Sequence, residues 1–481
     1  MLRLRRLTLD GSCLLFSNHQ EWLDSTGGCI DLLTSSDEAA KSYDATVTQL
    51  VGWYQDETLG GLQGSLDKML KADPEFLLGR ALALEVNLLG GLTAPRLNKS
   101  LEEKLAEFNE LVDKKRPQAS EQELLHAKVV NHWAKGELKQ AVRVFEQLTT
   151  IYPEDIAALK MSQDTYFYLG QALPMRHSIA NSLSKMNKEK NPLAGYAYGM
   201  FAFALEESNM YSQAEVQALK ALERIPRDTW AIHNYAHCLE MQGKTEEGLK
   251  WMLDKQPDWA PCSSLASHQY WHTALFHINN NNFDEAVRLL DEEVIPRCKS
   301  SCSSLDMHDS CSMVYRMELV DLFGKVGQKS TVEPKSRWKA LYDVCKQHKG
   351  DHLIGFNDAH YMMSFLGNDD LAMAREHIDS IESSSSSFGE VAPIVKPLLE
   401  AMYQFKLGNY ANCADLLEPI RFEIIKIGGS HAQRDVFEQL LLVAALKSNK
   451  PYHNQLAQRM LSEREVFHGR QTVQTQLLAK A

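Results

Sequence analysis

Several features that define whole classes of protein are missing from this chain of 481 residues. No run of about twenty apolar residues occurs, so the sequence predicts no membrane-spanning helix. The net charge is −12 and no basic block stands out. Nucleic acid is therefore not expected as a partner, because Lys and Arg supply most contacts to phosphates. No Asn-Gly or Asp-Gly turn joins two alternating apolar runs, so β-hairpins are not expected either.

The cysteines show no framework for disulfides or zinc. There are nine, an odd number, and no C-x-x-C occurs among them. The tightest group, in RCKSSCSSLDMHDSC at 297–311, fits no common zinc spacing. We expect reduced thiols and a cytoplasmic protein, with organelle targeting by the basic start MLRLRR as the alternative.

Motifs of the common enzyme classes are also missing. The chain has no nucleophile elbow, no dinucleotide fingerprint and no phosphate-binding loop. Three of its Gly-Gly pairs, at 60–61, 90–91 and 428–429, lie where helices are expected to end. The sequence therefore favours a protein without catalytic activity and leaves the question of an enzyme undecided.

Helical periodicity, by contrast, runs through most of the chain. Apolar residues recur with the helical period in pairs of segments, and each pair has to stack on its neighbours to bury its apolar face. Turns between paired segments occur every 34 to 39 residues, at Gly136, Gly170, Asn209, Gly243 and Asn281. A small residue recurs early in the second segment, at Ala141, Ala214, Gly248 and Ala286. This combination is typical of tetratricopeptide repeats.

The predicted fold is therefore all-α, a tetratricopeptide-like solenoid of helical hairpins that winds as a curved right-handed superhelix. We expect one solenoid over residues 22–470, with its clearest repeat units within 120–296. A polar loop is expected at 297–310, with further hairpins after it. Residues 1–21 are expected to form a leader outside the solenoid, and residues 471–481 a C-terminal tail.

Polar residues gather on the first helices of successive predicted hairpins, which line the concave face of such a solenoid. Helical spacing places His233, His237 and Glu240 on one face of the run HNYAHCLEM. The other candidates for this face are Asp164, His268, His272, Asn357 and Asp358. We expect the four histidines, Asp164 and Glu240 to converge on one polar pocket, because neighbouring helices pack about 8–10 Å apart.

A second group of polar residues follows the Gly-Gly pair at 428–429. Ser430 is expected to cap a helix on which His431, Arg434 and Asp435 share one face. This segment either forms an internal salt-bridged cap or closes one end of the groove.

Seven longer segments resemble the tetratricopeptide repeat protein 38 family. They are spread over most of residues 22–470 and are SYDATVTQLVGWYQDETLGGLQGSLDKMLKADPEF, MSQDTYFYLG, HCLEM, HQYWHTALF, DSCSMVYRME, FNDAHYMMSFLG and IRFEIIKIGGSHAQRDVFEQLL. The resemblance implies an α-helical repeat protein and brings no agreed catalytic residue with it. The candidate site residues therefore depend on their own pattern.

Two functions remain open. The first is an interaction or scaffold protein that holds a protein, a peptide or another extended ligand in the polar groove without a cofactor. The second is a small-molecule or metal-binding site, hydrolytic in its enzymatic form, in which His233, His237 and His272 bind zinc or another divalent ion. The zinc-protease motif is not present, because no glutamate directly follows His233.

Overall fold

The computed structural model describes residues 30, 32–91, 95–326, 334–381, 388–469 and 472–481. The predicted leader at 1–21 lies outside these residues. Within the described ranges the chain forms helices and no strand, so the all-α prediction is confirmed. None of the described helices is long and apolar enough to cross a membrane.

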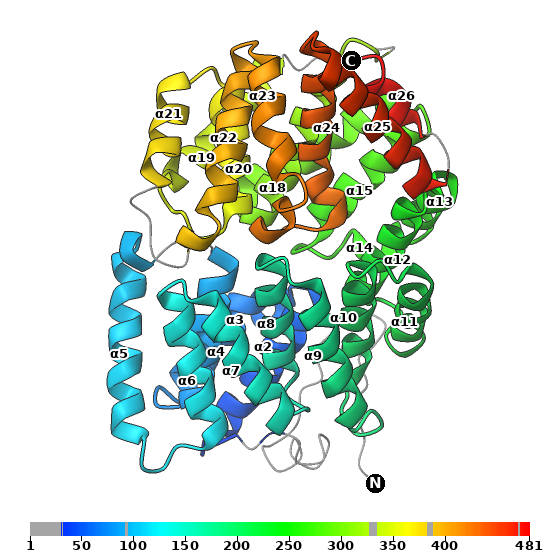
Figure 1. Cartoon of the computed structure of the whole chain (residues 1–481). Helices are drawn as coiled ribbons and strands as arrows, with labels where there is room; N and C mark the ends of the chain where they lie inside the picture. The colour runs from blue at the N-terminus through cyan, green and yellow to red at the C-terminus, as the bar shows by residue number, and fades with distance from the viewer. Residues whose placement is uncertain (1–29, 31, 92–94, 327–333, 382–387, 470–471) are drawn as a thin grey trace. The chain divides into compact units, whose positions relative to one another are not determined.

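The chain divides into two compact units, which we describe separately. The first ends at Tyr235 and also includes Asp258–Leu265, and the second comprises Ala236–Pro257 and Ala266–Ala481. Helix α12 (Thr229–Met241) contributes residues to both, and so does the short helix α14 (Gln256–Trp259). The remaining helices of the first unit, shown in Figure 1, are α2 (Asp37–Gly52), α3 (Gly61–Ala72), α4 (Leu77–Gly91), α5 (Lys99–Lys115), α6 (Glu121–Ala134), α7 (Leu138–Ile151), α8 (Ile156–Tyr168), α9 (Ala172–Lys185), α10 (Ala194–Glu206) and α11 (Tyr211–Arg224).

Helical hairpins form the first unit where the repeat pattern predicts them. Its predicted turns at Gly136, Gly170 and Asn209 all adopt the left-handed conformation, with φ of 73°, 62° and 59°. This conformation ends a helix and reverses the chain, and Gly and Asn reach it most easily. The predicted small residues Ala141 and Ala214 are fully buried, which allows the paired helices to approach closely.

A buried cluster of three ionisable side chains connects α4, α6 and the start of α8 in the first unit. His126 lies between two carboxylates, with Nδ1 2.8 Å from Glu85 Oε1 and Nε2 3.0 Å from Asp155 Oδ2. Burial lowers the pKa of His126, but the two carboxylates outweigh burial and raise the pKa to about 10. The imidazole is therefore charged in the folded protein, and both of its nitrogens donate hydrogen bonds.

The second unit continues as stacked helical pairs. The helical pairs α20–α21, α22–α23 and α24–α25 follow one another along the chain. In Figure 1, α22, α23, α24 and α25 lie in this order from left to right. The helices of this unit are α13 (Thr245–Asp254), α15 (Ala266–Asn279), α16 (Phe283–Leu289), α17 (Ile295–Ser301), α18 (Ser304–Leu319), α19 (Pro334–Cys345), α20 (Gly355–Gly367), α21 (Leu371–Ser380), α22 (Ala392–Lys406), α23 (Tyr410–Leu417), α24 (His431–Lys447), α25 (Pro451–His468) and α26 (Val473–Leu478).

The two remaining predicted turns, Gly243 and Asn281, are also left-handed, with φ of 67° and 58°. Gly248 is the small residue that lets α13 meet α15, because a Cβ atom there would lie 2.1 Å from Phe276 Cε1. The predicted turn and small-residue positions therefore mark real reversals and close helix contacts.

The polar loop predicted at 297–310 is wrong for most of its length. A π-helical segment (Leu290–Val294) joins α16 to α17, and α18 begins at Ser304. The sequence did not indicate a helix here, because α18 buries polar residues where most helices bury apolar ones. Asp306, Asp309 and Ser312 are among the buried polar residues.

Candidate functional site

Three histidines of the second unit lie together at the end of α12 and on α15. His268 and His272 are four residues apart and therefore share one face of α15. His237 comes from α12, and the side chains of His237, His268 and His272 are 0%, 4% and 0% exposed. Each offers a ring nitrogen, and these nitrogens all lie within 4.8 Å of one another.

The rings of His268 and His272 meet through their outer nitrogens. Nε2 of His272 lies 3.2 Å from Nε2 of His268, and the two ring planes are 83° apart. The ring centroids of His237 and His272 are 4.5 Å apart, at an angle of 62°. Three imidazoles thus converge on one small buried volume.

A carboxylate holds the other nitrogen of two of these rings. His268 Nδ1 lies 2.9 and 3.0 Å from the two carboxylate oxygens of Asp309 on α18. His272 Nδ1 lies 2.9 Å from Glu240 Oε2. An ionised carboxylate only accepts hydrogen bonds, so Nδ1 carries the hydrogen in both rings. This arrangement leaves Nε2 of each ring as the atom available to a ligand.

One face of α18 supports these rings. Asp309, Ser312 and Arg316 follow at intervals of three and four residues, and all three face α15. Ser312 Oγ accepts a 3.2 Å hydrogen bond from Trp271 Nε1, and the Arg316 guanidinium lies 5.6 Å from the centre of the Trp271 ring. Trp271 in turn stacks on His268, with 5.4 Å between centroids.

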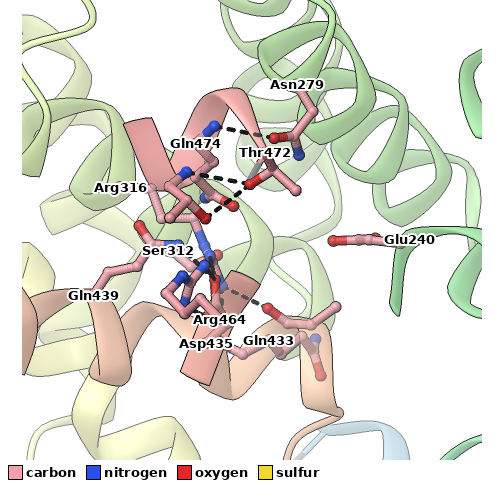
Figure 2. A network of polar contacts seen from close by, with 12 residues as sticks. Glu240, Asn279, Ser312, Arg316, Gln433, Asp435, Gln439, Arg464, Thr472 and Gln474 are labelled. Atoms are coloured by element: carbon pink, nitrogen blue, oxygen red, sulfur yellow. Dashed lines mark hydrogen bonds and ion pairs between the residues drawn. The ribbon is translucent and has the colours of Figure 1, made fainter. Parts of the chain in front are cut away.

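An ion network lies beside the histidines and is shown in Figure 2. Asp435 Oδ2 accepts a 3.0 Å hydrogen bond from Arg316, and Arg464 binds both oxygens of the same carboxylate. Burial alone would raise the pKa of Asp435, but Arg464 and Arg316 outweigh it and hold the pKa well below its usual range. Figure 2 shows the Glu240 carboxylate pointing toward this network.

The segment after the Gly-Gly pair at 428–429 forms the predicted cap. Ser430 Oγ accepts a 3.2 Å hydrogen bond from the backbone of Gln433, which caps α24. His431 and Arg434 contact each other, with 3.2 Å between Nδ1 and the guanidinium. Asp435 turns away from both, toward Arg316 and Arg464. Ser430 therefore caps α24 as predicted, and Asp435 links α24 to α18 and α25, while the closing of a groove by this segment stays a prediction.

Two further candidates on α20 bind other histidines. His308 Nε2 donates a 2.7 Å hydrogen bond to Asn357 Oδ1. Asp358 lies between His352 and His377, at 2.8 and 3.1 Å. Within the described residues, neither Asn357 nor Asp358 hydrogen-bonds to His268 or His272. Asn357 therefore groups with His308, and Asp358 with His352 and His377.

The remaining candidates, Asp164 and His233, belong to the first unit. Asp164 forms an ion pair with Lys160, whose ammonium lies 4.5 Å from the centre of the Trp53 ring. Burial raises the pKa of Asp164. His233 is buried against Trp230, with 4.7 Å between centroids. Their convergence with the second unit's histidines stays a prediction.

Asp309, Arg316 and Arg464 were not among the predicted site residues. Asp309 lies 41 positions from His268 along the chain, and no helical spacing rule connects them. The only sequence signal was the unusual polarity of the run DSCSMVYRME, which contains two of the three.

The chain matches no family model. Among solved structures it is similar to the crystal structure of the APC/C hetero-tetramer Cut9-Hcn1, with a TM-score of 0.40 and 12% identity, covering 88% of this chain and 70% of that chain. It is also similar to a monomeric mutant of IFIT1 with Gppp-AAAA, with a TM-score of 0.35 and 12% identity, covering 93% of this chain and 95% of that chain. The chemistry of the site is therefore argued from its own geometry.

Proposed function

We propose that the second unit binds one divalent transition metal ion between His237, His268 and His272, with zinc as the first candidate. The observation that carries this proposal is the approach of two ring nitrogens, Nε2 of His268 and Nε2 of His272, to 3.2 Å. Both rings have Nδ1 on a carboxylate, so in their neutral form both Nε2 atoms present lone pairs to each other.

A cation between the rings removes this repulsion. Zinc binds histidine nitrogen at about 2.0–2.1 Å, so two nitrogens of one tetrahedral site lie about 3.3–3.4 Å apart. The separation of 3.2 Å between His268 and His272 is close to that value. The other way to relieve the repulsion is a shared proton, in which one ring is an imidazolium that donates to its neighbour.

The surrounding charges favour a cation between the rings. Asp309 is fully buried and Glu240 largely so, and each carries one negative charge beside a histidine. Burying two carboxylates is costly unless positive charge compensates them. Arg316, which also binds Asp435, lies near Glu240 and offsets part of its charge, and a cation between the rings offsets the remainder. Carboxylates that orient histidine ligands in this way are the usual outer partners of protein zinc sites.

Three histidine ligands leave the fourth position of a tetrahedral zinc ion open. Sites of this composition bind a water molecule and lower its pKa, which makes hydroxide available near neutral pH. The enzymatic form of the proposal, a metal-dependent hydrolase that acts on a small molecule, additionally requires a path from solvent to this position, because the three histidines are buried.

The interaction-scaffold function remains the second candidate. It is supported by the repeated helical hairpins and by the resemblance to the tetratricopeptide repeat protein 38 family. A polypeptide in a groove needs accessible side chains, however, and His237, His268 and His272 are buried to 4% exposure or less. The burial of these histidines therefore favours an ion over a polypeptide as their ligand.

The test is the metal content of the purified full-length protein before and after dialysis against Zn²⁺ or Co²⁺. His272→Ala and His237→Ala should each lower the content by one equivalent per chain. His277→Ala is the matched control, because His277 is also buried on α15 and makes no contact with His268 or His272 in the interactions seen here. Its metal content should equal that of the wild type.

Two other results would point elsewhere. If His272→Ala leaves the metal content unchanged and lowers the melting temperature by several degrees, the histidines form a hydrogen-bonded core. If it changes neither quantity, the scaffold function gains support and should be pursued by pull-down with wild type against His237→Ala/His272→Ala.

A further inference from the structure

A second buried histidine–carboxylate cluster lies elsewhere in the second unit. His352 precedes α20, Asp358 lies in its first turns, and His377 lies on α21. Their side chains are 3%, 0% and 0% exposed. None of the three belongs to the proposed trihistidine site.

The three side chains meet at one carboxylate oxygen. His352 Nδ1 lies 2.8 Å from Asp358 Oδ1, and His377 Nε2 lies 3.1 Å from the same atom. The two rings are nearly parallel, with centroids 5.0 Å apart. The ligand atoms of all three residues lie within 4.8 Å of one another.

Hydrogen bonds within the described residues leave this cluster incomplete. Asp358 Oδ2 is buried and has no hydrogen-bond partner there. The same is true of both ring nitrogens of His377, since its Nε2 is close enough to Asp358 but at an angle unsuitable for a hydrogen bond. Unsatisfied buried polar atoms of this kind cost about 1–3 kcal/mol each.

The histidine–carboxylate cluster of the first unit shows what a purely structural arrangement looks like. There, each nitrogen of His126 has its own carboxylate in good hydrogen-bond geometry. In the second unit, by contrast, two imidazoles compete for a single oxygen while the second oxygen and one ring remain unsatisfied. Among the described residues, Glu85 Oε2 also lacks a hydrogen bond, so the difference between the two clusters lies in the histidines: both ring nitrogens of His126 are bonded, and neither ring nitrogen of His377 is.

We propose that His352, Asp358 and His377 bind a second divalent transition metal ion. Ligands of one metal point at the ion and not at each other, which fits the approach of His377 Nε2 to Asp358 Oδ1 without a hydrogen bond. His352 Nδ1 hydrogen-bonds to the same oxygen and has to exchange this bond for the ion. Two imidazoles and one carboxylate suit Zn²⁺ or Fe²⁺. Asp358 Oδ2 supplies a fourth donor atom when the carboxylate binds through both oxygens.

The outer contact of His352 also fits a ligand. Its Nε2 lies 2.8 Å from Ser380 Oγ, so the serine hydroxyl orients the ring and leaves Nδ1 directed at the cluster. Because the ligands come from the segment before α20, from α20 and from α21, the ion would join the two helices of one hairpin. We therefore assign it a structural role, distinct from the open trihistidine site.

The experiment is a comparison of metal equivalents per full-length chain after loading with Zn²⁺ or Co²⁺ and removal of free ions. Wild type should retain two equivalents, His377→Gln one, His272→Ala one, and the double variant none. Glutamine keeps a hydrogen-bonding amide at the position of the ring but is a poor ligand. His348→Gln is the control, because His348 binds Asp351 at 2.8 Å and stacks on Tyr361 but is not one of the three proposed ligands. This variant should retain two equivalents.

The two sites succeed or fail independently in this design. If His377→Gln retains as much metal as wild type, the second site is overturned, whatever His272→Ala does. If His377→Gln fails to fold, His272→Ala alone decides: one retained equivalent supports the second site and none overturns it. The Co²⁺ spectrum of His272→Ala, recorded against wild type, should then show one remaining ligand environment.

Discussion

At the scale of single residues, Asp309 fixes His268 through Nδ1, the ring nitrogen on the side away from the proposed metal ion. It holds Nδ1 of His268 with both carboxylate oxygens, at 2.9 and 3.0 Å. Asp309→Asn keeps the shape but replaces one accepting oxygen with a donor, so the ring loses its fixed tautomer and part of its basicity. We expect metal affinity to fall about 10–100-fold.

Competition with a chromophoric chelator measures this change, and circular dichroism should show an unaltered helix content. Glu318→Gln, on the same helix, is the control. Glu318 accepts a 2.8 Å hydrogen bond from Trp338 and does not touch the histidines. Equal affinity of Asp309→Asn and Glu318→Gln would contradict the role assigned to Asp309.

Asp228 of the first unit makes stability depend on pH. It accepts a 3.1 Å hydrogen bond from the backbone of Ala231, but burial dominates and raises its pKa from 3.8 to about 7. Between these values the folded state holds a proton that the unfolded state has lost. The stabilising contribution is therefore complete below pH 3.8 and is lost as the pH rises through 7, at about 1.4 kcal/mol per pKa unit.

Asp228→Asn should remove this loss, because asparagine also caps helices and cannot ionise. The melting temperature of wild type should fall between pH 5 and pH 8 more steeply than that of the variant. Differential scanning fluorimetry across this range checks the prediction, and parallel curves for the two proteins would contradict it.

The residues of the trihistidine site were only partly predictable from the sequence. Helical spacing placed His268 and His272 on one face, and likewise His237 and Glu240. The charges that support them could not be found in this way, because Asp309 and Arg316 reach the site through the packing of α18 on α15. A local spacing rule describes one helix and contains no information about its neighbour.

At the scale of helices, the turn residues were predictable and the beginning of α18 was not. Gly136, Gly170 and Gly243 indicate a reversal of the chain, because few residues other than glycine adopt a positive φ. The first turns of α18 gave no such signal, because they bury Asp306 and Asp309 instead of apolar residues, whereas helices were expected again after residue 310. Asp309 therefore belongs to the proposed site and also made the start of α18 look like a polar loop in the sequence.

The contact of α4, α6 and α8 through His126 gives a prediction at this scale. His126→Ala leaves Glu85 and Asp155 buried without a cation, at 2% and 0% exposure. Removing one partner of a buried ion pair typically costs about 3–5 kcal/mol, and a similar loss is expected here.

Chemical denaturation followed by circular dichroism measures the loss. His132→Ala is the matched control on α6, since His132 pairs with Glu137 at 2.7 Å but is about one-third exposed. Its variant should lose at most about 1 kcal/mol, as exposed ion pairs do. Similar losses for both variants would show that the buried cluster contributes no more to the free energy of unfolding than an exposed ion pair does.

At the scale of the whole molecule, the two units use their buried polar groups differently. The first unit satisfies His126 with protein carboxylates on both sides. The second unit contains the two histidine clusters for which we propose metal binding, around His272 and around His377. Metal binding should therefore stabilise the second unit and leave the local stability of the first unit's helices unchanged.

Hydrogen exchange measured on the full-length protein tests this expectation. A ligand present at 100 times its dissociation constant stabilises the state that binds it by about 2.7 kcal/mol, which slows exchange through unfolding about a hundredfold. Zn²⁺-loaded protein should thus exchange far more slowly than chelator-treated protein in peptides from α15 and α18. Peptides from α4, α6 and α8 should exchange at equal rates in both samples. In His272→Ala the difference at α15 should disappear while that at α20 and α21 persists, because the second site is intact. A uniform slowing along the whole chain, or none at all, would contradict the assignment of metal binding to the second unit.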